Sequence, residues 1–139
     1  MKKSKILLKT ISFISLLTIL ILEILPYGVA LNFATPDERI RQTYSYFSLT
    51  PFGYANFFPL LTALLTVFII LLSLFDLFKK TARPWLNKTI LISTALALVL
   101  SVLPLLVFGS DYMTPVGFVI TSLFFLFLIL QVLINKKEN

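Results

Sequence analysis

Four long runs of apolar residues dominate the chain. A helix needs roughly 20 apolar residues, each rising about 1.5 Å, to cross about 30 Å of hydrocarbon. Runs of that length cover residues 10–31, 57–78, 89–108 and 116–134, and Glu23 and Asp76 are the charged residues within them. Helices satisfy their backbone hydrogen bonds internally, as lipid requires. We therefore predict an all-α integral membrane four-helix bundle, with residues 1–139 forming a single membrane domain.

Composition supports this class and excludes several kinds of chemistry. The 139 residues are 58% hydrophobic and 13% charged, whereas soluble domains carry about 25% charged residues. The chain has no Cys and no His, which excludes disulfide scaffolds, thiol nucleophiles, histidine acid–base catalysis and the usual zinc or haem ligands. No glycine-rich phosphate loop is present. We therefore expect no enzyme, cofactor or metal site.

The distribution of basic residues predicts the orientation. Ten of the twelve Lys and Arg residues lie before the first run, in the connection 79–88 or after the fourth run, and the other two are Arg39 and Arg41. By the positive-inside rule, both termini are expected in the cytoplasm and the chain in the cytoplasmic membrane. All five tyrosines fall at the opposite end. The positive charge is explained by topology and comes with no nucleic-acid-binding motif, so no nucleic-acid partner is expected.

The first run has a second interpretation. Lysines before an apolar stretch, followed by Gly28-Val29-Ala30, also fit a signal peptide with its cleavage site. Signal peptides have apolar regions of about 7–15 residues, whereas this run is longer and contains Glu23 and Pro26. A membrane span is favoured, and cleavage stays open.

The predicted outer loop, residues 32–56, is long enough to have structure of its own. Thr35-Pro36-Asp37-Glu38 matches a capping box with proline at the first helical position. Ile40, Tyr44 and Phe47 follow at helical spacing. We predict a short amphipathic helix from Pro36 to about Tyr46. The alternative is an extended strand through residues 44–49. The other outer connection, residues 109–115, is short.

Aromatic residues crowd the second half of this loop. Seven of the fifteen residues from Tyr44 to Phe58 are aromatic. They form either a recognition surface, because aromatic side chains supply binding area at low entropic cost, or an aromatic belt against lipid headgroups. The candidate surface residues are Tyr44, Tyr46, Phe47, Phe52 and Tyr54.

Glu23 is the most informative polar residue, because a carboxyl group within a span is costly and often functional. Pro26 follows three residues later and is expected to kink the helix. One hypothesis is a proton- or cation-coupled site. The other is a structural carboxyl group, paired with Arg39 or Arg41 or hydrogen-bonded to Thr62, Thr66 or a tyrosine.

Other polar and small residues predict helix contacts. Asp76 precedes Lys79 and Lys80 by three and four residues, the spacing of local ion pairs. Gln131 is a candidate interhelical donor. A small-residue ridge, more typical of packing inside the bundle than of an oligomer interface, is formed by Ser93, Ala97 and Ser101.

Three stretches in the first half of the chain are Leu22-Glu23-Ile24-Leu25-Pro26-Tyr27-Gly28, Asn32-Phe33-Ala34 and residues 44–57. In these stretches the chain resembles a family of small uncharacterised four-span membrane proteins of bacteria. The resemblance implies the same four-helix architecture and no activity. Small multidrug exporters are similar in span count and in one acid, but their connections are short.

The sequence therefore favours a non-catalytic scaffold or interaction protein that acts through its outer loop or helix contacts. Its expected partners are the lipid bilayer and a membrane protein or a second copy of the chain. The alternative is a small transporter that uses Glu23.

Overall fold

The computed structural model describes residues 2–34, 38–78 and 84–136, with residues 2–5 described by their backbone alone. Its long helices are α1 (Lys2–Ile24), α3 (Phe58–Phe78), α4 (Pro84–Phe108) and α5 (Pro115–Lys136). Between α1 and α3 lie strands β1 (Val29–Ala34) and β2 (Arg39–Tyr44) and the short helix α2 (Leu49–Gly53). A 3-10 turn, η1 (Ser110–Tyr112), connects α4 to α5.

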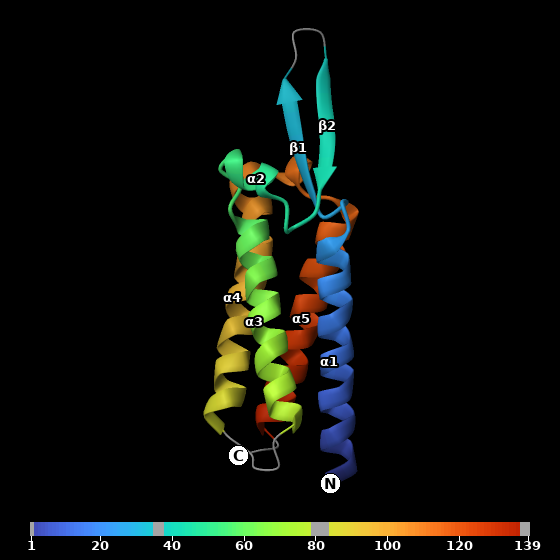
Figure 1. The fold of residues 1–139 in the computed structure, drawn as a ribbon, viewed down its shortest axis with the longest axis vertical. Coiled ribbons are helices and arrows are strands. Elements are labelled where there is room, and N and C mark those ends of the chain that lie inside the picture. Colours follow the sequence, from blue (N-terminus) through green and yellow to red (C-terminus); the bar gives the residue numbers. More distant parts are fainter. Residues whose placement is uncertain (1, 35–37, 79–83, 137–139) are drawn as a thin grey trace.

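The four long helices run alternately up and down in one bundle (Figure 1). Each packs against two others, giving the closed order α1, α3, α4, α5 and back to α1. The first residue of α1 and the last of α5 lie at one end, and the β-hairpin projects from the other (Figure 1). The bundle is the predicted all-α four-helix architecture, with the strand pair as a small addition.

The surface of the bundle is apolar. Each of the four helices is long and apolar enough to cross a membrane. Large side chains such as Leu71, Ile92 and Leu106 are 60%, 69% and 72% exposed on these helices, an arrangement unfavourable in water and suited to lipid. The chain is therefore a multi-pass membrane protein.

The core is formed by side chains from all four helices. It includes Leu16 and Ile19 of α1, Ile69 of α3 and Phe124 and Phe127 of α5, all fully buried. Close packing of these side chains defines the inward face of each helix, although the outward faces of the helices are apolar as well.

The predicted spans differ from the helices at three places. α1 begins at Lys2, eight residues before the first run, residues 10–31, and it ends as a helix at Ile24, because Pro26 lacks a backbone N–H and a turn follows. Pro26 therefore ends α1 and does not kink it. The third helix starts at Pro84, five residues earlier than predicted, so residues 84–88 of the predicted connection are helical. Residues 58–78 and 115–136 agree closely with the second and fourth spans.

The predicted outer amphipathic helix from Pro36 to Tyr46 is wrong. Residues 39–44 form β2, which pairs antiparallel with β1 in the register Val29–Tyr44 to Ala34–Arg39. The end of the first apolar run supplies β1, so both partners of the hairpin lie close together in sequence. The predicted strand through residues 44–49 is also displaced, since β2 ends at Tyr44 and α2 begins at Leu49. Three capping-box residues, 35–37, lie outside the described residues.

Candidate functional site: the hairpin and its connections to the bundle

The base of the hairpin is joined to α5 through Thr114. The Thr114 hydroxyl donates to the Gly28 carbonyl oxygen at 2.9 Å and accepts from the Gly117 N–H at 2.9 Å. One side chain therefore caps α5 and holds the turn that follows α1. A Cβ on Gly117 would lie 2.9 Å from the Gly28 carbonyl oxygen, so this close approach of two backbones requires glycine.

Further contacts fix the hairpin on two sides. Val29 forms a bridge to Met113, and the Arg41 guanidinium donates to the Met113 carbonyl oxygen at 2.9 Å. On the opposite side, the Phe33 ring meets the Tyr54 ring edge-on, with centroids 5.2 Å apart. Residues 29–31 are buried. The lower half of the hairpin is therefore part of the folded bundle.

The second strand of the hairpin is open along nearly its whole length. Residues 39–43 of β2 are exposed, including Gln42 and Thr43 opposite the buried base of β1. Met113 occupies the outer edge of β1 at Val29, whereas β2 pairs with β1 alone in the described part of the chain. An unpaired strand edge presents backbone donors and acceptors to another chain. This edge carries Arg39 and Arg41, and its strand contains no acidic residue.

The structure divides the predicted aromatic surface. Phe52 and Tyr54 are exposed, Tyr44 is half-buried, and Phe47 packs against the core. Tyr46 is 2% exposed, so it belongs to the core and not to a surface. Its N–H donates to the Glu23 carbonyl oxygen at 2.9 Å. Burial raises the pKa of the Tyr46 phenol, and the Glu23 carboxylate adds to the rise.

An outer cavity of about 470 Å³ lies between the hairpin and η1. Its lining consists of Asn32, Phe33, Ala34, Arg39, Arg41, Asp111 and Tyr112. Residues directly opposite in the register share a face of the sheet, and Asn32 pairs with Arg41 as Ala34 pairs with Arg39. Both arginines therefore lie on the face that borders the cavity.

Glu23 lies in the last turn of α1, with no exposed surface. Its Oε1 accepts from the Thr66 hydroxyl of α3 at 2.9 Å, and its Oε2 has no partner in the described structure. Thr66 Oγ1 also lies 3.1 Å from the Thr62 carbonyl oxygen. One hydroxyl proton is thus shared between two acceptors. Among the hydrogen-bond partners predicted for Glu23, the structure shows Thr66.

The predicted pairing of Glu23 with Arg39 or Arg41 is wrong. Both arginines lie on the projecting hairpin, and Arg41 donates to the Met113 carbonyl oxygen. The ion pair formed among the described residues joins Lys9 to Asp76 and involves neither arginine. Both arginines belong to the hairpin that projects from the end of the bundle (Figure 1) and not to the predicted outer helix.

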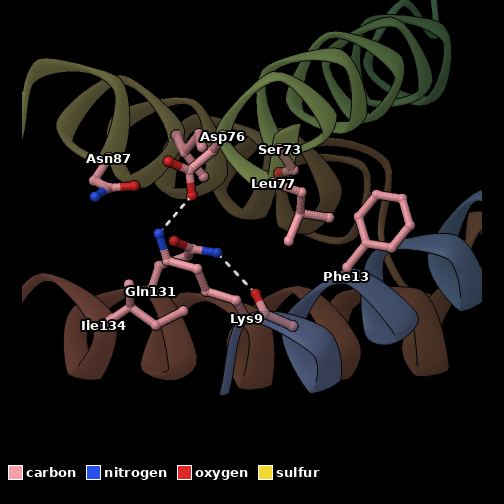
Figure 2. A pocket seen from close by; sticks show the side chains of 10 residues that line it. Lys9, Phe13, Ser73, Asp76, Leu77, Asn87, Gln131 and Ile134 are labelled. Atoms are coloured by element: carbon pink, nitrogen blue, oxygen red, sulfur yellow. Dashed lines mark hydrogen bonds and ion pairs between the residues drawn. The ribbon is translucent and has the colours of Figure 1, made fainter. Parts of the chain in front are cut away.

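A second polar cluster lies between the helices (Figure 2), near the first residues of α1 and the last residues of α3. Lys9 of α1 reaches Asp76 of α3, with Nζ and Oδ2 2.7 Å apart. The predicted partners Lys79 and Lys80 lie outside the described residues. Gln131 Nε2 donates to Ser12 Oγ at 2.8 Å, which confirms Gln131 as an interhelical donor. A cavity of about 20 Å³ between these groups has room for about one water molecule.

The small-residue ridge of α4 faces the interior. Ser93, Ala97 and Ser101 are all buried, and the Ser101 carbonyl oxygen lies 3.5 Å from the Thr121 hydroxyl of α5. This placement agrees with packing inside the bundle.

Three features of the site have no counterpart among the predicted residues. Met113 and Thr114 anchor the hairpin, and Asn56 is buried with no partner for either amide atom in the described structure. Thr114 before Pro115 is a recognisable helix start, but its bond to Gly28 depends on the fold.

Comparison with known proteins finds no matching family model, curated protein or solved structure. The resemblance to the four-span family therefore stays a prediction.

Proposed function

We propose that this chain is a non-catalytic protein of the cytoplasmic membrane that presents its β-hairpin outside the cell as a recognition element for another membrane protein. The orientation is supported by the ten basic residues expected at the opposite end of the bundle. The termini would then lie in the cytoplasm.

The observation that carries this proposal is the contrast between the two strands of the hairpin. β1 is buried at its base and held by Thr114, Met113 and Tyr54, while residues 39–43 of its partner β2 are exposed. A rigid base lowers the conformational entropy lost on binding. A loop that served only to connect α1 with α3 would need no such support.

The free edge of β2 favours binding by strand addition. In this mode an extended segment adds to a sheet edge, so that backbone hydrogen bonds supply affinity and side chains supply specificity. Because β2 contains Arg39 and Arg41 and no acid, the complementary partner is an extended segment that carries Asp or Glu. A second copy of the chain is the other occupant to be distinguished.

Site-directed photo-cross-linking in membranes tests the proposal. A photoreactive residue at Thr43, on the exposed strand, is expected to capture one protein, and the cross-linked peptide of that protein should contain acidic residues. Arg39→Glu with Arg41→Glu should reduce the yield at least tenfold. Lys88→Glu, at the other end of the bundle, is the matched control and should leave the yield unchanged.

The photoreactive residue at Ile92, on a lipid-facing helix position, reports nonspecific capture. The same products from positions 43 and 92, or lipid alone from both, contradict the proposal. A product of twice the chain mass at position 43 identifies the second copy as the partner and contradicts the assignment of an acidic membrane protein.

A second candidate function is a small proton- or cation-coupled transporter. It is favoured by the unpartnered Oε2 of Glu23 inside the bundle. Against it, fully buried Leu16 and Ile19 separate Glu23 from Ser12 along α1, so the buried polar groups of this helix do not form a continuous row. Reconstituted vesicles distinguish the two functions. Proton or cation flux lost in Glu23→Gln and retained in Thr62→Val supports transport, and absence of flux in the folded wild type opposes it.

A further inference from the structure

We infer that the outer cavity between the hairpin and η1 binds a phosphate ester that carries an ammonium group, a phosphoethanolamine head group being the simplest example. This inference goes beyond the proposed protein partner. It concerns the face of the hairpin, whereas strand addition uses the edge of β2.

Two arginines supply the phosphate-binding part. Arg39 and Arg41 are two residues apart on one strand, so their Cα atoms are roughly 7 Å apart on the same face. Neither has an acidic partner within the described residues. A guanidinium group has five N–H donors in a planar fork that matches phosphate oxygens. The two side chains can therefore hold one phosphate group from two directions.

One of these arginines is already positioned. Arg41 Nη2 donates to the Met113 carbonyl oxygen at 2.9 Å, which orients its guanidinium group before a ligand binds. Most of its five donors remain for the phosphate. Ala34, opposite Arg39 in the register, has a small side chain and leaves space beside the strand. The Asn32 amide adds a neutral donor opposite Arg41.

Asp111 and Tyr112 supply the part that recognises an ammonium group. Both belong to η1 and line the same cavity as the arginines. A carboxylate beside an anion-binding pair would oppose a simple phosphate by like-charge repulsion, but it favours a ligand with a positive charge next to its phosphate. The aromatic ring of Tyr112 is also a favourable neighbour for a cation.

The level of the cavity fits the head-group layer. The membrane-spanning part of α4 ends at Phe108, and η1 follows directly, with the Tyr112 and Phe108 rings 5.4 Å apart. Head groups occupy a layer of about 5–8 Å outside the hydrocarbon on each side. The cavity opens just beyond the end of α4, and its volume of about 470 Å³ is within the range of small-ligand sites.

Calorimetric titration of the full chain in a maltoside detergent tests the site. The probes are dihexanoyl phosphatidylethanolamine, its phosphatidylcholine counterpart, dihexanoylglycerol and soluble O-phosphoethanolamine. The ethanolamine lipid is expected to bind more tightly than the choline lipid, whose methyl groups block hydrogen bonds to Asp111. Dihexanoylglycerol, which lacks the phosphate, should not bind. Equal affinity for all three lipids overturns the inference.

Soluble O-phosphoethanolamine distinguishes the source of the head group. If it binds as tightly as the lipid, the natural ligand is a free phosphate ester of the same chemistry. If it binds at least tenfold more weakly, the acyl chains contribute and the ligand is a lipid. A peptide rich in Asp and Glu, the chemistry of the proposed protein partner, is titrated in parallel. Binding of the peptide reports on the proposed function, and the inference is overturned if the peptide binds and the ethanolamine lipid does not.

Variants separate the two parts of the site. Arg39→Gln, which removes no described hydrogen bond, should weaken binding of both phospholipids about tenfold, as expected for lost charge-assisted bonds. Asp111→Asn should remove the preference for ethanolamine over choline. Lys88→Gln removes a positive charge at the other end of the bundle and should change neither. Unchanged binding by folded Arg39→Gln, checked by circular dichroism, overturns the assignment.

Discussion

The Thr66 hydroxyl of α3 lies 2.9 Å from Oε1 of Glu23 on α1, and neither residue is exposed. The bond joins two helices that are separated by the hairpin and α2 in sequence. Thr66 is the hydrogen-bond donor to Oε1 of Glu23, and Oε2 of the same carboxyl group has no partner in the described structure. Because the carboxyl group is buried, removing this hydrogen bond is costly.

Thr66→Val is expected to destabilise the folded protein by about 1–3 kcal/mol, because it leaves a buried carboxyl group without its donor. Thr62→Val is the matched control, since Thr62 is equally buried one turn away and its hydroxyl bonds only the Phe58 carbonyl oxygen of its own helix. Unfolding equilibria in mixed detergent measure both variants. Equal losses of stability would show that the bond to Glu23 has no special contribution.

The ion pair between Lys9 and Asp76 is expected to couple α1 with α3. Its side chains are 23% and 12% exposed, so solvent screens part of the attraction, and the coupling free energy should be about 1 kcal/mol. A double-mutant cycle with Lys9→Gln and Asp76→Asn measures it. A second cycle that combines Lys88→Gln with Asp76→Asn is the control. Additive effects of Lys9→Gln and Asp76→Asn would exclude the coupling.

Thr114→Ala is expected to lower stability by about 1–2 kcal/mol, because it removes both the cap of α5 and the bond to the Gly28 carbonyl oxygen. Thr114→Ser keeps the hydroxyl and should retain most of the stability. Protection of the hairpin amides in hydrogen exchange should fall in Thr114→Ala and not in Thr114→Ser. Unchanged protection in both variants would mean that Met113 and Tyr54 hold the hairpin without Thr114.

Tyr46 predicts a loss of stability at alkaline pH. Its pKa is raised by burial in the folded state, so the unfolded chain releases the phenolic proton at a lower pH than the folded chain. Stability is unaffected by this group below about pH 10 and falls as pH rises above it, by up to about 1.4 kcal/mol per pH unit. Tyr46→Phe should lose stability less steeply between pH 10 and 11. Parallel curves for wild type and Tyr46→Phe would contradict the burial of this phenol as the cause.

The helices could be predicted from sequence because length and apolarity alone define a span. The second and fourth runs agree with α3 and α5 within about two residues. The hairpin could not be predicted, because β1 is hidden at the apolar end of the first run. The residues of β2 also fit a helical pattern after Thr35–Glu38. The choice between the two depends on contacts with Met113 and Thr114, which lie more than 65 residues away.

Site residues were identifiable by type but not by partner. Glu23 stood out as a buried acid, and Thr66 was one of several named partners, because rotation of α3 about its axis is not determined by the sequence pattern. Local spacing pairs Asp76 with Lys79 and Lys80, which lie outside the described residues, and the structure pairs it with Lys9 on another helix. Local spacing identifies pairs within one helix, whereas pairs between helices depend on how the bundle packs.

The attachment of the hairpin has a mechanical consequence. Its base is tied to the end of α1 through Gly28 and to the start of α5 through Thr114, and these two helices lie against each other along the bundle. A force applied to the hairpin is therefore transmitted to both helices and acts on the interface between α1 and α5. At the other end of this interface, Gln131 donates a hydrogen bond to Ser12. Tilting of α1 against α5 would therefore change the length of this hydrogen bond at the opposite end of the bundle.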